Sequence, residues 1–357
     1  MHKDTGRRIG PSRRELLKGA AGLAAFGLAL RLAPQALAQS GTPRSPGAAD
    51  NDPLMTGTRL VLLGTRGGPG VDLNRGEAAS AVVVNGTPYV VDCGYGTLRA
   101  LVASGLGYNR LGTIFFTHLH DDHTSDLAAL LSHQWTGSRT EPTNVYGPHG
   151  TAALVEAAIA FFRANVEIRI VDEGRTTLPE TLFHGHDLAA TAAPAEAFKD
   201  ERVAVTAIEN THFPERSKAK MPYRALSYRF DTQDRSIVFS GDTAYSKSLV
   251  ELARGADLFV CEVMDQGVYE RNHARAQAEA AAGNAESIWR HVAETHSTPS
   301  DVARMASEAN VKTVVLNHLL PGPRTSDRLE FPVTTFVDGV RATFSGNVIV
   351  GQDLMVL

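Results

Sequence analysis

The run THLHDDH at residues 117–123 restricts what this chain can fold into more than any other feature. It directly follows an apolar segment that is typical of a buried strand. Side chains two apart on an extended backbone point the same way, so His118 and His120 can bind one metal ion. The turn after them directs Asp122 and His123 toward a second. Imidazoles with a carboxylate suit zinc, with manganese or iron as alternatives, whereas a solvated histidine-rich turn is disfavoured at a strand end.

Short β-rich runs alternate with helical patterns along the rest of the chain. The predicted strands cover residues 59–64, 79–84, 88–92, 111–117, 144–146, 203–208, 225–230, 236–240, 258–263, 311–317, 341–344 and 348–350. The predicted helices cover residues 97–104, 125–132, 151–165, 247–255, 269–294 and 300–309. Strands and helices in both halves predict an α/β fold, an αββα sandwich of two mixed sheets with helices on both outer faces.

The first 38 residues have the pattern of a bacterial twin-arginine export signal. Paired arginines, Arg13 and Arg14, precede a short apolar stretch rich in Gly and Ala, which ends in a small-residue cleavage site at 36–38. The stretch is shorter than the roughly 20 residues of a spanning helix, so no stable membrane anchor is expected. Residues 39–57 predict a flexible linker, and 58–357 a single folded domain. We therefore expect a periplasmic protein that meets the twin-arginine translocation machinery during export.

Charge argues against bulk nucleic-acid binding. Residues 1–38 hold seven Lys and Arg and two Asp and Glu, so removing them leaves 28 basic and 37 acidic residues and a formal net charge of −9. A protein that neutralises many phosphates needs the opposite balance. Cys93 and Cys261 lie in apolar strand-like runs and are expected to be buried thiols, although a disulfide is an alternative in an oxidising compartment.

The histidine run resembles the metallo-β-lactamase superfamily, together with a glycine-rich first hairpin that ends in Asp92-x-Gly94-x-Gly96. The resemblance implies further metal ligands at three positions, each of which this chain matches near a strand end. His212 corresponds to the third ligand of the first metal, Asp242 to the bridging carboxylate, and His318 to the last ligand of the second metal. The resemblance thus implies a dinuclear zinc site of His118, His120, Asp122, His123, His212, Asp242 and His318.

The segment Thr295-His296-Ser297-Thr298 resembles the ribonuclease Z and arylsulfatase-like branch. There, this histidine is not a ligand but stabilises or protonates the reacting ester; an incidental histidine beside a helix cap is the alternative. Transfer-RNA-processing members carry a long arm between the third histidine and the bridging aspartate, and this chain has only 30 residues from His212 to Asp242. Beta-lactamases proper normally lack the bridging aspartate.

These features predict a metal-dependent hydrolase of a small anionic ester, such as an aryl sulfate or phosphodiester. A metal-held hydroxide attacks, while Asp122 and His296 are the expected catalytic residues. A lactonase or other carbonyl hydrolase is the alternative; ribonuclease Z-type RNA hydrolysis, a mono-iron dioxygenase and a non-catalytic binding protein rank lower.

Several segments remain outside this scheme. The helical insert at 269–294 is expected either over the site or at a homodimer contact. The remaining histidines are expected on the surface or behind the ligands; they are His133, His149, His184, His186, His273 and His291. Of these, His184 and His186 are candidates for the pocket rim.

Overall fold

The computed structural model describes residues 53–278, 285–321 and 333–357. The predicted export signal and most of the predicted linker lie outside these residues. The end of the linker segment forms a 3-10 turn, η2 (Pro53–Met55), whose Leu54 is buried, so ordered contacts begin slightly before Thr58. Within the described residues, no helix combines the length and the apolar character needed to cross a membrane.

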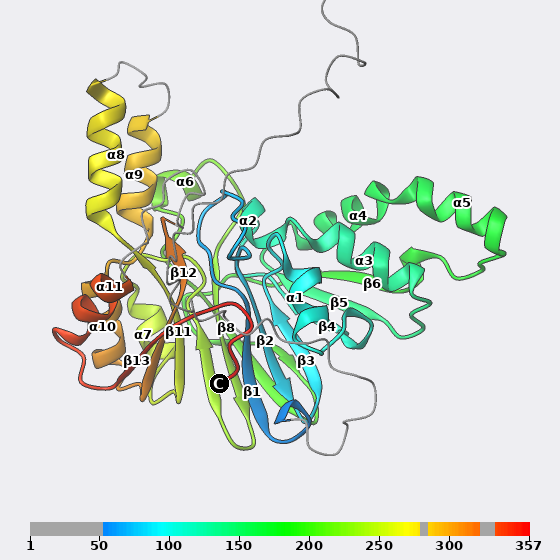
Figure 1. Ribbon diagram of the computed structural model, residues 1–357, viewed down its shortest axis with the longest axis horizontal. Helices are drawn as coiled ribbons and strands as arrows, with labels where there is room; N and C mark the ends of the chain where they lie inside the picture. Colours follow the sequence, from blue (N-terminus) through cyan, green and yellow to red (C-terminus); the bar gives the residue numbers. More distant parts are fainter. Residues whose placement is uncertain (1–52, 279–284, 322–332) are drawn as a thin grey trace, which may run out of the picture. The chain divides into compact units, whose positions relative to one another are not determined.

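Two mixed β-sheets form the framework, as the sequence predicts (Figure 1). The first has the order β1-β2-β3-β4-β5-β6, and the second β13-β12-β11-β10-β9-β8-β7. Each sheet combines antiparallel and parallel pairs. The strands are β1 (Thr58–Gly64), β2 (Ala79–Val84), β3 (Thr87–Val91), β4 (Thr113–Phe115), β5 (Thr143–Gly147), β6 (Phe183–Asp187), β7 (Ala195–Lys199), β8 (Val203–Glu209), β9 (Leu226–Thr232), β10 (Ser236–Phe239), β11 (Leu258–Met264), β12 (Thr313–Leu320) and β13 (Asn347–Val350).

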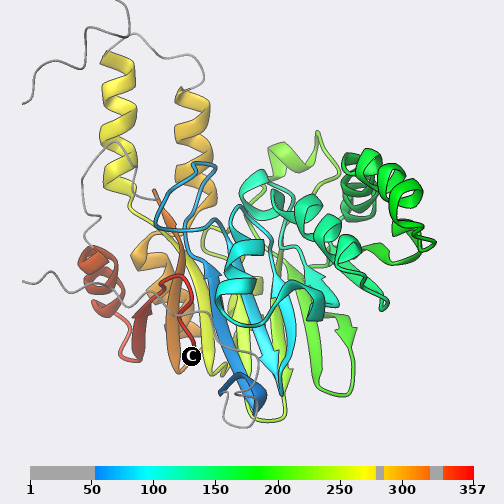
Figure 2. The ribbon, with the colours of Figure 1, turned by 45° about the vertical axis from the view of Figure 1, so that its right-hand side comes forward.

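Helices cover the outer face of each sheet and complete the αββα sandwich. The first sheet packs against α1, α3 and α4, and the second against α7, α10 and α11 (Figures 1 and 2). The helices are α1 (Thr97–Ala103), α2 (Asp121–Thr124), α3 (Leu127–Thr136), α4 (Thr151–Phe161), α5 (Arg163–Glu173), α6 (Glu215–Lys218), α7 (Lys247–Leu252), α8 (Gln266–Ala278), α9 (Ala285–Thr295), α10 (Pro299–Glu308) and α11 (Val333–Arg341), with 3-10 turns η3 (Tyr108–Arg110) and η4 (Pro179–Thr181).

The alternation of side chains along the strands creates separate hydrophobic layers. On β1, Leu60 and Leu62 face the second sheet, whereas Val61 and Leu63 pack under the outer helices. All four side chains are buried, because successive residues of a strand point to opposite faces. A strand that is apolar at every position therefore indicates a sheet covered on both sides.

The predicted insert at 269–294 contains two helices, α8 and α9, that lie side by side (Figure 2). His273 Nε2 on α8 lies 2.9 Å from Glu286 Oε2 on α9, and the His273 ring stacks on Trp289. Residues 279–284, which the prediction placed within the insert, lie outside the described residues. The two helices project beyond the sheets at the end where β11 and β12 finish.

Two other sequence predictions were wrong in detail. The predicted strand 341–344 is instead the end of α11 and the turn after it. Its apolar positions continue a helical spacing, since Phe336, Val340 and Phe344 recur every fourth residue and are all buried against the second sheet's helix layer. The predicted helix 151–165 is divided into α4 and α5 at Phe162.

The layer between the sheets generates a stability prediction. Phe115 of β4 is fully buried, and its ring lies within 5.8 Å of the ring centroids of Tyr146, Phe198, Tyr228 and Phe230. Phe115→Ala should lower the free energy of unfolding by about 3–5 kcal/mol, because the cavity cannot collapse between two sheets. Urea unfolding of metal-free protein measures this change.

The exposed phenylalanine at the end of α4 is the matched control for this measurement. Phe161 is 79% exposed, so Phe161→Ala should change the unfolding free energy by no more than about 0.5 kcal/mol. Equal effects of the two substitutions would contradict the assignment of Phe115 to the inter-sheet core.

Candidate metal centre

The end of β4 delivers the first four candidate ligands. The backbone N–H of Phe116 donates to Tyr146 O at 2.7 Å, which keeps the chain in the sheet as far as the histidine run. His120 is still extended, with φ −68° and ψ 156°, and the short helix α2 begins immediately after it. This change from extended chain to helix separates His118 and His120 from Asp122 and His123, as the sequence pattern predicts.

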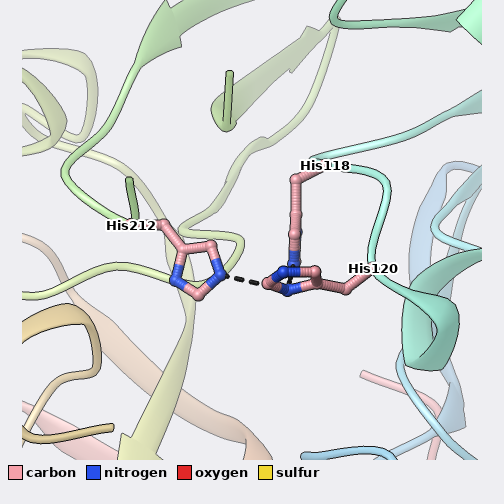
Figure 3. A group of neighbouring side chains, drawn as sticks. All are labelled: His118, His120 and His212. Atoms are coloured by element: carbon pink, nitrogen blue, oxygen red, sulfur yellow. Dashed lines mark hydrogen bonds between the residues drawn. The ribbon is translucent and has the colours of Figure 1, made fainter. Parts of the chain in front are cut away.

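Three imidazoles converge in the first cluster (Figure 3). His118 Nε2 lies 2.9 Å from His120 Nδ1, and His212 Nε2 lies 3.3 Å from the same atom. Ligands at the usual zinc–nitrogen distance in a tetrahedral site lie about 3.3 Å apart. The other ring nitrogen of His212 faces the carbonyl of Thr295 at 3.3 Å, so its Nε2 is free to point into the cluster.

The second cluster joins Asp122, His123 and His318. His318 Nε2 lies 3.2 Å from Asp122 Oδ2, and His123 Nε2 lies 3.7 Å from the same oxygen. Asp242, at the end of β10, lies between the two clusters. Its Oδ1 is 3.3 Å from both His123 Nε2 and His318 Nε2, and its Oδ2 is 3.8 Å from His118 Nε2. One carboxylate thus faces both clusters.

The polar atoms of the two clusters fit a pair of divalent cations. His123 Nε2 and Asp242 Oδ1 are buried and form no hydrogen bond within the described residues. Buried polar atoms without partners are rare unless an ion or water completes them. Burial lowers the pKa of His118 and His212 well below the usual value and favours the neutral imidazole that binds metals. The donor set of imidazoles and carboxylates suits zinc.

Asp92 positions one ligand and was not predicted as a site residue. Its Oδ2 lies 2.9 Å from His123 Nδ1, which leaves His123 Nε2 directed toward Asp242. Asp92 also accepts hydrogen bonds from the backbone N–H and hydroxyl of Thr117. Its backbone has φ 61°, a conformation uncommon for residues other than glycine. Its place at the end of a strand, beside Gly94, was the available signal.

His296 lies beside both clusters and is tied to a second unpredicted residue, Glu262 of β11. His296 Nδ1 lies 2.7 Å from Glu262 Oε2, and both side chains are buried. Burial lowers the pKa of His296, but the Glu262 carboxylate outweighs burial and raises the pKa to about 9. A protonated His296 is therefore favoured at neutral pH. The signal for Glu262 was a single charged residue inside an apolar strand, because such a charge requires a buried partner.

His291 is the third side chain that sequence reasoning did not place in the site. It lies on α9, with its ring centroid 5.3 Å from that of His212 and 5.8 Å from that of His120. The prediction that His184 and His186 rim the pocket was wrong. Both lie on β6, where His186 Nε2 is 2.9 Å from Asn144 Oδ1, and neither contacts the clusters.

The remaining predictions for single residues can be compared directly with the structure. His133 and His149 are exposed and His273 pairs with Glu286 away from the clusters, as expected for residues that are not ligands. Cys93 and Cys261 are buried free thiols, which excludes the alternative of a disulfide in this structure.

The contact between Asp92 and His123 generates a prediction for metal affinity. Asp92→Asn should lower the affinity for zinc by about 10–100-fold, because the carboxylate fixes the tautomer and orientation of the His123 ring. Competition with a chromogenic chelator measures the change, and Asp231→Asn, at the partly exposed end of β9, is the matched control. Unchanged affinity in Asp92→Asn would show that His123 does not depend on this contact.

Comparison with known proteins places this arrangement in a family. Residues 87–319 match the family described as Beta-lactamase superfamily domain. A ribonuclease Z from Mycobacterium sp. (strain KMS) is 30% identical over 264 residues, covering 73% of this chain and 84% of the relative. A ribonuclease Z from Mycobacterium bovis (strain BCG) is 28% identical over 300 residues, covering 83% and 96%.

Solved structures share the fold. Human tRNase Z, short form, is 23% identical with a TM-score of 0.55, covering 84% of this chain and 98% of that one. The metallo-beta-lactamase fold protein YhfI from Bacillus subtilis is 18% identical with a TM-score of 0.58 and the same coverage. The family match includes all seven candidate ligands and leaves out the strands β1, β2 and β13. This chain therefore belongs to the metallo-β-lactamase superfamily and is a metal-dependent hydrolase.

Proposed function

We propose that the chain hydrolyses a small anionic ester of the phosphodiester type with two divalent metal ions, zinc being the first choice. The observation that carries the proposal is the position of Asp242, whose two oxygens face different imidazole clusters. Seven side chains would hold the ions: His118, His120 and His212 on one side, Asp122, His123 and His318 on the other, and Asp242 between them. When bound, the ions supply Lewis acidity and a water whose pKa is lowered toward about 7.

Asp122 is the proposed base and orienting residue. Its Oδ2 accepts a hydrogen bond from the Gly68 backbone N–H at 3.0 Å and lies 3.2 Å from His318 Nε2. Burial raises the pKa of Asp122, but His123 and His318 outweigh burial and lower it well below the usual value. The carboxylate is therefore ionised at neutral pH, and it can accept a hydrogen bond from the attacking water and orient it toward the phosphorus.

His296 is the proposed proton donor to the leaving oxygen. Its Nδ1 is engaged by Glu262, so Nε2 is the nitrogen available to a substrate. Because the adjacent carboxylate favours the imidazolium form, His296 can carry a proton to the alkoxide or aryloxide that leaves. Glu262 itself accepts a hydrogen bond from the backbone N–H of Thr243, the residue after Asp242. This contact links the position of His296 to that of the Asp242 carboxylate.

The relatives favour a phosphodiester over the aryl sulfate among the anionic esters, because they bear the name ribonuclease Z and a ribonuclease cleaves phosphodiester bonds. The same name makes RNA cleavage the second candidate. The segment from His212 to Asp242 is described in full and consists of α6, β9, β10 and their loops, with no long arm of the kind carried by the transfer-RNA-processing members. We therefore rank a compact ester above RNA, with a lactone next.

Metal content and activity should depend on the same residues. The wild type should bind about two zinc ions per chain and hydrolyse bis(4-nitrophenyl) phosphate. His120→Ala should lose metal and activity together, since it removes the imidazole that contacts both other members of the first cluster. Elemental analysis and nitrophenolate release measure these, and His133→Ala on the exposed face of α3 is the matched control.

The same assay separates the competing functions. Faster turnover of 4-nitrophenyl sulfate or of a lactone would move the substrate class to the alternatives. Specific cleavage of a precursor transfer RNA at rates above those of the diester would favour RNA. Full activity in protein with one tightly bound metal would overturn the two-metal proposal.

The role of His296 can be tested through the leaving group. His296→Ala should leave zinc content unchanged and lower turnover of an alkyl phosphodiester by about 10²–10⁴-fold. The loss should be smaller for 4-nitrophenyl esters, because nitrophenolate hardly needs protonation. His186→Ala, a half-buried histidine held by Asn144, is the control.

Equal losses on alkyl and nitrophenyl esters would assign His296 to charge stabilisation rather than proton transfer. Full activity on every ester would remove it from the catalytic set.

A further inference from the structure

A pocket of about 880 Å³ opens directly beside the first metal cluster. Its walls are the start of α4, the segment 213–223 that includes α6, and one face of α9. Among the seven candidate metal ligands, only His120 lines it. A volume of this size is typical of sites for small molecules. The pocket therefore connects the reactive centre with space for a substituent of the substrate.

One side of the helix α9 forms a wall of the pocket. Ser287, Arg290 and His291 line the pocket, at the i, i+3 and i+4 positions that share one side of a helix. Glu294 continues this face and pairs with Arg216, so that an ion pair joins α9 to the segment 213–223. Ile288 is not in the lining and is 49% exposed. The insert thus shapes the pocket rather than merely covering the sheet ends.

His291 stands where the pocket meets the clusters. Its ring centroid lies 5.6 Å from that of His296 and 5.8 Å from that of His120. Thr295 Oγ1 lies 3.4 Å from His291 Nδ1, on the side toward the helix. Because His120 and His291 both line the pocket, a substrate that reaches the first cluster from the pocket lies beside this imidazole, which can hydrogen bond to its oxygens.

The lining combines apolar side chains with positive charge. Leu119, Leu154, Phe213, Met221 and Tyr223 supply the apolar surface, whereas Arg216, Lys220 and Arg290 are its only charged members apart from histidine. No Asp or Glu belongs to the lining, although two of the three cations have carboxylate partners outside it: Arg216 pairs with Glu294, and Arg290 lies 3.8 Å from Glu286 Oε1. This composition fits an anionic ester with a bulky apolar group, because the cations attract the anion and the apolar wall accepts the group.

We infer that this pocket binds an aryl or similarly bulky apolar group that stays on the phosphorus, and that His291 positions the phosphoryl oxygens. The inference rests on the proposed function. His296, the proposed donor to the leaving oxygen, does not line the pocket, whereas His120 and His291 do. The leaving group therefore departs on another side, and the pocket receives the retained group.

Filling the pocket tests this inference. Ala153 lines the pocket on α4 and is exposed, so Ala153→Trp can occupy the space without replacing a candidate ligand. It should raise KM for bis(4-nitrophenyl) phosphate about tenfold more than KM for methyl 4-nitrophenyl phosphate. The two esters share a leaving group and differ only in the retained group. Elemental analysis checks that zinc content is unchanged.

Binding of phosphonates to zinc-loaded protein gives a readout independent of turnover. By titration calorimetry, the wild type should bind phenylphosphonate more tightly than methylphosphonate, and Ala153→Trp should remove the difference. His291→Ala should weaken both about tenfold at unchanged zinc content, with partial recovery in His291→Asn, which keeps a hydrogen-bonding group. Ile288→Ala, an exposed residue of α9 outside the pocket lining, is the control and should bind both as the wild type does.

The outcomes separate the two levels of proposal. Equal affinity of the wild type for both phosphonates, or undiminished phenyl preference in Ala153→Trp, would overturn the pocket assignment. Wild-type affinity in His291→Ala would overturn the role of His291. A phenyl preference that depends on Ala153, in a protein without diesterase activity, would support the pocket and remove the proposed reaction.

Discussion

The fold depends on burying a concentration of polar groups at the end where the two sheets meet. The seven candidate ligands, five imidazoles and two carboxylates, converge there, and all but His120 are buried. Groups of this kind are costly to bury unless they are paired or bound to an ion. The protein meets this requirement by pairing the Nδ1 atoms of ligands whose Nε2 atoms point into the clusters. Asp92 contacts Nδ1 of His123, and the Thr295 carbonyl contacts Nδ1 of His212. Among the described residues, His123 Nε2 and Asp242 Oδ1, which face each other between the clusters, remain without hydrogen-bond partners.

The local part of this arrangement could be predicted from the sequence, because residues 117–123 change from strand to helix within a few residues. His212, Asp242 and His318 could be named only through resemblance, since nothing local shows that three distant strands end at one edge. Long-range contacts explain what was missed. Glu262 belongs to an apolar strand, and its role depends on His296, 34 residues away. His291 became part of the site only because α9 packs beside the clusters.

The prediction of the sheets succeeded for a related reason. Strands covered on both faces are apolar at every position, so their runs stand out, as on β11, where all seven residues are buried. The edge strands β6 and β7 are half exposed and carry Glu, His and Lys, and no apolar run marks them. The C-terminal strand at 341–344 was misassigned because a short apolar stretch fits both a helix and a strand. A strand is therefore easiest to predict from the sequence when both of its faces are buried.

The candidate metal ligands and the proposed recognition pocket belong largely to different parts of the framework. The candidate ligands follow strand ends, where backbone hydrogen bonds within the sheets limit movement. The pocket walls are α6, α9 and the start of α4, elements outside both sheets, and α9 also contacts a ligand through the Thr295 carbonyl, which lies 3.3 Å from His212 Nδ1. The charge distribution follows the same division. The chain has a formal net charge of −4, yet the charged residues of the pocket apart from histidine are all cations. A chain of net negative charge with cations in this pocket lining supports the proposed preference for a compact anionic ester over an extended polyanion, because binding of an extended polyanion needs many cations.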